Sequence, residues 1–259
     1  MMNNSKEGFV LYKGKKYEVK NGELHLPYGT EIDWLDDEIG ELEKLRFDEI
    51  EGFEKLTNLK KLYCDIYELR KIENIDHLQN LKSLVIENSP YLNKIENLDN
   101  LTNLKILDLT DSNIAVIENL DHLINLESLR LGKNYETSCE DYITEITGLE
   151  NLPNLNMLDL CGNRIKDISG LETLTNLKIL VLTYNQIKEI KGLDNLSSLE
   201  RLYLRGNIIT EIKGLENLSN LKVLGIQENG PFDDNSISVI ENMRKKGIKV
   251  RCEGYWLYD

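Results

Sequence analysis

The sequence between Leu155 and Asn229 repeats with a period of 22 residues. Leucine recurs at the first position of each row, and further leucine or isoleucine columns follow three and five residues later. A fourth column holds one residue type in every row: Asn163, Asn185, Asn207 and Asn229. Fixed apolar columns at a fixed period predict a solenoid, in which repeats stack side by side and share one core.

Each row has the pattern of one short strand followed by a return segment. In the second row, Leu180 and Leu182 flank Val181, which predicts a strand whose leucines point inward and whose valine faces solvent. Asn185 follows at the turn, where its amide group offers donors and an acceptor to the loop backbone. Burial of the apolar side chains in one row does not offset the entropy cost of ordering it, so a row needs neighbours to fold.

The row pattern Leu-x-x-Leu-x-Leu-x-x-Asn-x-Ile-x-x-Ile resembles that of the leucine-rich repeats over residues 59–229. The 22-residue length and the stretch IKGLENLSNLKVL are most similar to the subclass found in the leucine-rich regulator of type-1 protein phosphatase. The internalin adhesins are the second resemblance. The resemblance implies an α/β fold, a curved horseshoe with a parallel β-sheet on its concave face and short helical turns on its convex face. It carries less information about function, because this architecture hosts many binding roles.

The repeat region is predicted to span residues 42–228, with a degenerate first repeat and then seven rows that begin at Leu59. The asparagine column fails in the early rows, where Tyr67, Ser89 and Ser112 occupy it, so we expect less regular turns there. The row at 126–154 contains an insertion at residues 135–142. Two interpretations stand for this insertion: an aromatic, acidic contact loop, or a surface insertion that costs little stability.

Caps are predicted at both ends, because a solenoid otherwise exposes an apolar end. Residues 1–41 are expected to form an N-terminal cap, with a β-meander over residues 10–26 and a short helix near Asp33–Ile39. The pair Asn21-Gly22 is typical of a hairpin turn in such a meander.

The C-terminal cap is predicted at residues 229–259, as a helix followed by a strand. Acidic residues from Asp233 onwards favour a helix start, and Gly247 favours its end. The apolar face of this helix is predicted to consist of Ile237, Ile240 and Met243.

Composition bounds the function classes. The chain of 259 residues carries a formal net charge of −14, which disfavours binding to nucleic-acid phosphates and to anionic membranes. No apolar run approaches the roughly 20 residues of a transmembrane helix, and Phe9–Tyr12 is too short for a secretory signal. We therefore expect a cytoplasmic monomer. The four cysteines are spaced for neither a disulfide framework nor a metal site.

Catalytic chemistry finds no support in the sequence. His77 and His122 occupy the same repeat position on the outer coil, and His25 lies in the N-terminal cap. None of the three has a cysteine or carboxylate at ligand or catalytic spacing, and no glycine-rich phosphate loop is present. We therefore predict no enzyme activity, no metal and no cofactor.

The strand side chains that alternate with the inward leucines are predicted to face solvent on the concave sheet. An apolar stripe there is formed by Met157, Ile179, Val181 and Val223, and it is flanked by aromatic and arginine side chains. This is the composition of a protein interface, although β-branched residues also suit strands for local reasons. The predicted binding residues are Tyr63, Asp108, Arg130, Met157, Asp159, Ile179, Val181, Tyr184, Arg201, Tyr203 and Arg205.

These observations predict a non-enzymatic module that binds a protein partner on its concave face, as a regulatory or scaffold subunit. The resemblance implies a phosphatase partner, since in that regulator acidic and aromatic concave side chains hold the phosphatase. The description fits Tyr63, Asp108, Asp159 and Tyr203, whereas the departures from it are Arg130, Val181, Arg201 and Arg205. The alternative is an internalin-like recognition or adhesion protein of a bacterial surface, although this chain has Gly-Leu where that family usually has Pro-Leu.

Overall fold

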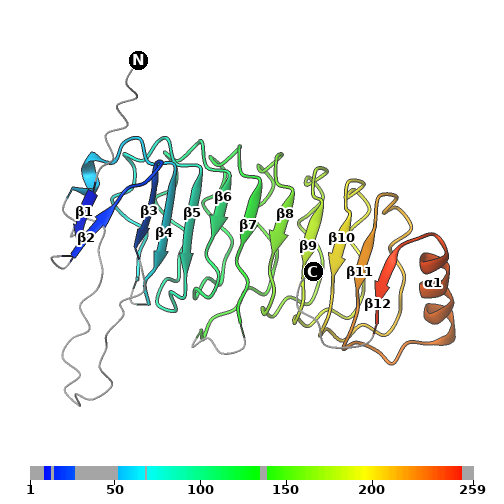
Figure 1. Cartoon of the computed structure of the whole chain (residues 1–259). Coiled ribbons are helices and arrows are strands. Elements are labelled where there is room, and N and C mark those ends of the chain that lie inside the picture. Colours follow the sequence, from blue (N-terminus) through cyan, green and yellow to red (C-terminus); the bar gives the residue numbers. More distant parts are fainter. Residues whose placement is uncertain (1–8, 13–14, 27–51, 68, 135–138, 253–259) are drawn as a thin grey trace, which may run out of the picture.

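The spine of the protein is one ten-stranded sheet in which the strands lie side by side in chain order from β3 to β12 (Figure 1). The computed structural model describes residues 9–12, 15–26, 52–67, 69–134 and 139–252. All neighbours in the sheet pair in parallel and in register, so that Leu158, Leu180 and Leu202 lie opposite one another. The strands are β3 (Glu23–Leu26), β4 (Lys61–Asp65), β5 (Ser83–Glu87), β6 (Ile106–Asp108), β7 (Ser128–Arg130), β8 (Met157–Asp159), β9 (Ile179–Val181), β10 (Arg201–Tyr203), β11 (Val223–Gly225) and β12 (Lys249–Arg251). The predicted solenoid is confirmed.

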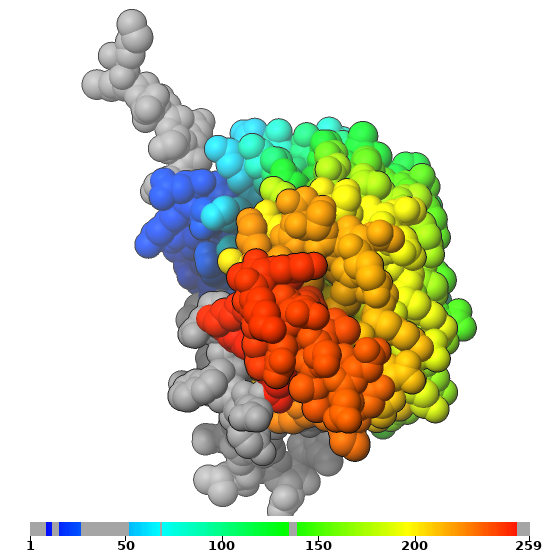
Figure 2. Space-filling model, turned by 90° about the vertical axis from the view of Figure 1, so that its right-hand side faces the viewer, coloured from blue at the N-terminus to red at the C-terminus, as the bar shows by residue number. Residues whose placement is uncertain are grey.

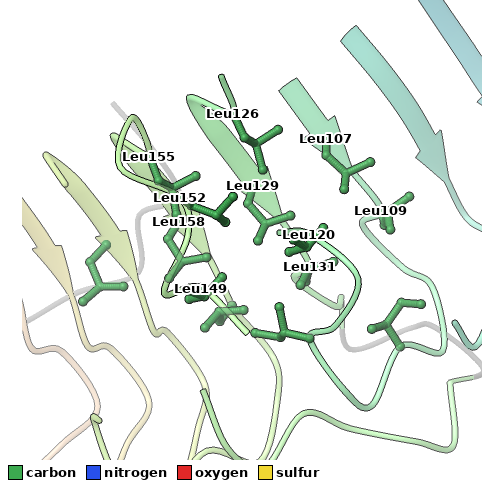
Figure 3. Packing of buried hydrophobic residues seen from close by; sticks show 14 of the residues in the cluster. Leu107, Leu109, Leu120, Leu126, Leu129, Leu131, Leu149, Leu152, Leu155 and Leu158 are labelled. Carbon is green, nitrogen blue, oxygen red and sulfur yellow. The ribbon is translucent and has the colours of Figure 1, made fainter. Parts of the chain in front are cut away.

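The leucine and isoleucine columns form one continuous core along the stack. Around β7, Leu129 and Leu131 from the strand side meet Leu120 and Leu126 from the return segments, and all four are buried (Figure 3). Because each row contacts the rows on both sides, the core grows by one layer per repeat.

The N-terminal end departs from the predicted meander. β1 (Phe9–Tyr12) and β2 (Lys15–Glu18) form an antiparallel pair, as expected. The third strand does not continue that meander, because β3 pairs in parallel with β4 and begins the long sheet. The turn between β2 and β3 contains Asn21 and Gly22, both with positive φ, 54° and 79°. Lys20 and Glu23 on either side of this turn form an antiparallel bridge, so the hairpin turn predicted at Asn21-Gly22 is confirmed, although β3 then pairs with β4.

β3 also occupies the place beside β4 that the sequence assigned to a degenerate repeat over residues 42–58. Leu24 and Leu26 of β3 supply the inward pair there and are buried. The strand expected over residues 42–47 stays a prediction. Those residues, and the helix expected near Asp33–Ile39, lie outside the described residues. The cap and repeat boundaries at residues 41/42 and 228/229 stay predictions.

The convex side consists of hydrogen-bonded turns. Leu123 N donates to Leu120 O at 2.9 Å, and Leu126 N donates to Leu123 O at 2.8 Å, an i→i+3 pattern that other rows repeat. Among the described residues, only η2 (Phe53–Lys55) and α1 (Asp234–Lys245) are long enough to count as helices. The expected short helical turns are thus single turns that connect one strand to the next.

One position per row adopts a positive φ ahead of these turns. Asparagine occupies it in early rows and glycine in later ones: Asn74, Asn97, Asn119, Gly148, Gly170, Gly192 and Gly214. At Gly192, a Cβ atom would lie 2.1 Å from the carbonyl oxygen of Ile168, so glycine alone fits. At Asn97, the side-chain amide instead donates to Ile72 O at 2.7 Å.

The asparagine column that follows each strand forms a ladder between rows. Asn185 Nδ2 donates to Leu160 O and Asn185 Oδ1 accepts from Ile165 N, both at 3.0 Å. The predicted role of the amide is confirmed, and equivalent pairs of bonds are made by Asn163, Asn207 and Asn229. Asn134 lies in the same column, but it is exposed and bonds to Asp111.

A second asparagine ladder, which the sequence analysis overlooked, runs along the return segments. Asn176 Nδ2 donates to Pro153 O at 2.8 Å, one row earlier. The same bond type is made by Asn80, Asn103, Asn125, Asn154 and Asn220. Each of these residues directly precedes the first leucine of a row, so a recurring Asn-Leu pair is its signal in the sequence.

The C-terminal end of the stack is closed by α1 and β12, which lie across the last repeats (Figure 2). Asp233 caps α1, since its Oδ1 accepts from Ser236 N at 2.7 Å. Ile240 and Met243 face the core as predicted. Ile237 does not, because 46% of it is exposed.

Ser236 takes the buried place expected for Ile237. Its Oγ accepts a hydrogen bond from Ile212 N at 2.9 Å, and this bond joins α1 to the last repeat. No helix among the described residues is long and apolar enough to cross a membrane.

Candidate functional site: a hollow on the concave face

A hollow of about 500 Å³ lies on the concave face over β5 to β10. Eight of the eleven predicted binding residues line it: Asp108, Arg130, Met157, Asp159, Ile179, Val181, Arg201 and Tyr203. Six further residues complete the lining: Glu87, Thr110, Gly132, Lys133, Asn134 and Cys161. Tyr63, Tyr184 and Arg205 lie outside it.

The apolar part of the hollow is narrower than the sequence suggested. Met157 and Ile179 lie side by side in the β8–β9 register and are partly exposed. Val181 is only 1% exposed, so the prediction that it faces solvent is wrong. Its short side chain lies between Asp159 and Tyr203 in the register, and these longer neighbours shield it. The accessible apolar surface is therefore formed by Met157 and Ile179.

The acidic part of the hollow centres on β5, β6 and β8. Asp108, predicted to face solvent, is only 3% exposed. Its Oδ1 accepts from the Thr110 hydroxyl at 2.6 Å, and its Oδ2 accepts from Arg130 Nη1 at 3.3 Å. Asp108 is thus fixed within the sheet surface, and Arg130 is held over it.

Two other carboxylates in the hollow are less well compensated. Burial, together with the charges of Asp108 and Asp65, raises the pKa of Glu87. Burial also raises the pKa of Asp159, against the opposing effects of the Cys161 N–H group and of Arg130. Burial is the main cause of both shifts, so the charged forms of these two carboxylates are poorly solvated and only partly compensated by Arg130.

Arg201 and Tyr203 of β10 form the opposite end of the hollow. Arg201 is exposed and Tyr203 is partly exposed. A Cβ atom at Gly225 of β11 would lie 3.1 Å from Tyr203 Cδ1, so the glycine leaves room for the tyrosine ring. The two ends of the hollow therefore differ in charge, with the apolar pair between them.

Tyr63 lies apart from the hollow, near the N-terminal end of the sheet. Its ring stacks on His25 of β3, with the ring centroids 4.3 Å apart and an angle of 8° between the planes. Lys61 and Glu23 form an ion pair at 2.7 Å on the same two strands. Tyr63 thus belongs to a separate cluster that joins β3 to β4.

Tyr184 and Arg205 form a third group, with Gly206 and Glu228. Arg205 is only 8% exposed, against the expectation that it faces solvent, and its Nη2 lies 2.6 Å from Glu228 Oε1. Its guanidinium carbon lies 5.3 Å from the centroid of the Tyr184 ring. Tyr184 has a φ of 54°, and a Cβ atom at Gly206 would lie 2.2 Å from its ring. These contacts join the segments that follow β9, β10 and β11.

The comparisons with known proteins agree with this geometry. A family model described as "Leucine Rich repeats (2 copies)" matches residues 153–195. The chain is a leucine-rich-repeat solenoid. The crystal structure of internalin C2 from Listeria monocytogenes is similar, with a TM-score of 0.62 and 28% identity, over 71% of this chain and 79% of that one. An internalin (InlF) from Listeria monocytogenes matches with a TM-score of 0.50 and 25% identity, over 92% of this chain and 82% of that one. No curated protein matches in sequence.

Lys133 is a feature of this leucine-rich-repeat sheet that the sequence analysis missed. It lines the hollow, is buried, and donates to the carbonyl oxygens of Ile114 and Asp141. Burial lowers its pKa, against the opposing charges of Cys139, Asp141 and Asp111. A lysine between a leucine column and an insertion gives no sequence signal for such burial.

The described part of the insertion, residues 139–142, is bonded to the repeats. Asn113 Oδ1 accepts from the backbone N–H groups of Glu140 and Asp141, at 3.0 and 2.8 Å. The Tyr142 ring lies 4.0 Å from the guanidinium carbon of Arg164. These contacts fix one limb of the insertion beside the hollow. Residues 135–138 lie outside the described residues, and neither interpretation of the insertion is decided.

The described lining of the hollow suits recognition better than catalysis. It contains no histidine, and burial raises the pKa of its Cys161 thiol to about 12, so the thiolate is scarce at neutral pH. Among the described residues, no group of three or more histidine, cysteine or carboxylate side chains is placed to hold a metal ion. Leucine-rich-repeat folds of this kind generally serve as protein-interaction scaffolds.

Proposed function

We propose that the protein is a non-enzymatic module that binds a protein partner in the hollow on its concave face. The observation that carries this proposal is the partly exposed pair of Met157 and Ile179, placed between an acidic end and Arg201 with Tyr203. Apolar surface of this kind, bordered by aromatic and arginine side chains, is typical of interfaces. The partner's identity, a regulatory or scaffold role, and a monomeric, cytoplasmic form are parts of the proposal.

Two partner classes follow from the resemblances. A type-1 phosphatase is favoured by the repeat subclass and by the acidic and aromatic concave residues Asp159 and Tyr203. An internalin-like role in surface recognition or adhesion is favoured by the two similar crystal structures. Two of the four departures from the phosphatase regulator's pattern, Val181 and Arg205, are buried, so they contribute little to the exposed surface that a partner would contact.

The test is affinity capture from a lysate of the source cells with the full-length chain as bait. The concave variant is Ile179→Asp, which places a charge in the centre of the hollow. The control is Ile124→Asp, at a residue that is 53% exposed in the segment between β6 and β7. Both substitutions place one negative charge at an isoleucine that is at least partly exposed, so both chains should keep the wild-type Tm within about 2 °C.

We expect one or more proteins to be retained by wild type and by Ile124→Asp. The amount retained by Ile179→Asp should be at least tenfold lower. A phosphatase among them supports the regulatory role. Equal retention by all three chains would refute binding in the hollow. Cell fractionation with an antibody to the chain then separates a cytoplasmic protein from one displayed at the surface.

A further inference from the structure

The middle of the concave face carries a surplus of negative charge. Glu87 is under the electrostatic influence of Asp65, Asp108 and Asp111, and Asp159 under that of Asp108. Arg130 is the cation that acts on both Glu87 and Asp159. Lys133 also lines the hollow, but its ammonium group is buried against two carbonyl oxygens.

The structure distinguishes carboxylates that are used internally from those that are available. Asp108 accepts from Thr110 and Arg130, and Asp111 accepts from the backbone and side chain of Asn134. Asp159 accepts a single hydrogen bond from described residues, from Cys161 N to its Oδ1 at 2.9 Å, and the carboxylate of Glu87 accepts none from them. Glu87 and Asp159 are therefore the groups that a bound cation would meet.

The apolar pair lies at a defined spacing from these carboxylates. Met157 and Asp159 are two residues apart on β8, so their side chains project from the same face about 7 Å apart. Ile179 lies opposite Met157 on β9. A ligand that satisfies both features must place a cation and an apolar group about 7 Å apart on one face, which residues i and i+2 of an extended peptide do.

We infer that the hollow recognises an extended segment of a protein partner in which a lysine or arginine lies two residues from an apolar residue. The cation lies against Asp159, and the apolar side chain lies against Met157 and Ile179; Glu87, three strands away on β5, adds to the negative charge that attracts the basic segment. This inference rests on the proposed function, because it names the chemistry of the partner that the same hollow binds. A charge-assisted hydrogen bond to Asp159 supplies orientation, and burial of the apolar side chain supplies affinity.

The inference is tested by selecting phage-displayed random 12-residue peptides on the full-length chain. We expect enriched peptides to share a basic residue and an apolar residue at a fixed short spacing. Synthetic copies of the enriched peptides are then measured by fluorescence anisotropy against wild type and against Glu87→Gln/Asp159→Asn. The double variant should weaken their binding at least tenfold, and an increase from 50 to 300 mM NaCl should weaken binding to wild type.

The matched control is Glu145→Gln/Glu150→Gln, which also removes two charges but at exposed residues outside the sheet. It should leave the affinity within twofold of wild type. Enriched peptides without a basic residue, or peptides that bind the double variant as well as wild type, would overturn the inference.

Failure of the inference and failure of the proposed function are distinguishable. One outcome is that peptides bind Glu87→Gln/Asp159→Asn as tightly as wild type and bind Ile179→Asp more weakly. This result would refute recognition of a basic residue but would still support binding in the hollow. No enrichment above uncoated wells would overturn the inference as well. The capture experiment with Ile124→Asp as control decides the proposed function independently.

Discussion

The rows before the insertion and the rows after it build the same strand and turn with different side chains. From Asn163 to Asn229, each asparagine accepts from one backbone N–H group of the preceding row and donates to one of its carbonyl groups. Before the insertion, Ser89 donates one hydrogen bond to the preceding row, and the buried Ser112 hydroxyl has no partner among the described residues.

The comparison teaches that the apolar columns define the fold and the polar columns set how tightly rows are joined. The inward leucines are equally buried in both halves, as at Leu84 and Leu180. At the turn after each strand, the side-chain links between rows are fewer in the first half, although Asn97 and Asn119 add links from the return segments there. We therefore expect the rows after residue 155 to be the more stable part of the solenoid.

The largest expected effect comes from a charge in the core. Leu180→Asp places an unpaired carboxylate among fully buried side chains and should unfold the whole stack. Leu84→Asp should unfold the early rows and leave a protease-resistant C-terminal fragment. Far-UV circular dichroism and limited proteolysis measure both results. Identical behaviour of the two variants would show that the halves do not differ in stability.

Val181→Asp separates the structure from the sequence-based expectation. The sequence predicts that this residue faces solvent, so that the variant folds normally. The structure buries Val181 beside Asp159, so the substitution should lower the Tm strongly, though by less than Leu180→Asp does. An unchanged Tm would mean that Val181 belongs to the accessible surface of the hollow.

Substitutions in the asparagine column after the strands should give the next largest difference in stability between the two halves. Asn185→Ala leaves the buried Ile165 N without a partner and removes one of the two amide groups that donate to Leu160 O, so it should cost roughly 2 kcal/mol. Ser89→Ala removes one such bond, to Ile66 O at 2.8 Å, and should cost about 1 kcal/mol. Urea denaturation measures both. Equal costs would mean that the ladder does not distinguish the halves.

Substitutions at the positions with positive φ test the same difference between early and late rows, with smaller expected effects on stability. Gly192→Asn should cost about 2 kcal/mol, because its Cβ atom would lie 2.1 Å from Ile168 O. Asn97→Gly loses only the hydrogen bond to Ile72 O and should cost about 1 kcal/mol or less. If Gly192→Asn proved neutral, the later rows would have the same room between repeats as the early ones.

The sequence predicted the parts of the fold that depend on a repeated pattern. Leucine columns identify the inward face because the same requirement recurs in every row, and the asparagine ladder follows from an amide at a fixed place. β3 was assigned to the wrong partner, because a strand of four residues carries no information about whether it pairs with β2 or β4.

The candidate site was predicted in part for a similar reason. Alternation along β8 to β10 places Met157, Ile179 and Arg201 on the concave face. It does not predict how much of each side chain remains accessible, because that depends on neighbours in adjacent rows. Val181 and Asp108 are therefore buried where alternation predicts exposure, and Lys133 is buried although no pattern indicates it.

The smallest expected effects concern pH, and they have opposite signs at Asp159 in the hollow and at Glu228 after β11. The pKa of Asp159 is raised in the folded protein, so its charge opposes folding at pH 7, and this cost is relieved as the pH falls through the raised pKa. Asp159→Asn should therefore raise the Tm by about 2 °C at pH 7 and change it little at pH 3.5.

Glu228 provides the opposite case. Its hydrogen bond with Arg205 lowers its pKa, so the charged form stabilises the fold above the ordinary carboxylate pKa, and this contribution is lost as the pH falls through the lowered value. Glu228→Gln should therefore lower the Tm by about 2 °C at pH 7, with a difference that shrinks toward pH 3. Melting curves of wild type and both variants across this range measure the two signs. A stabilising Glu228→Gln or a destabilising Asp159→Asn at pH 7 would contradict the division into a negatively charged hollow and a neutralised edge. Glu145→Gln, at an exposed carboxylate away from both groups, should leave the Tm unchanged at every pH.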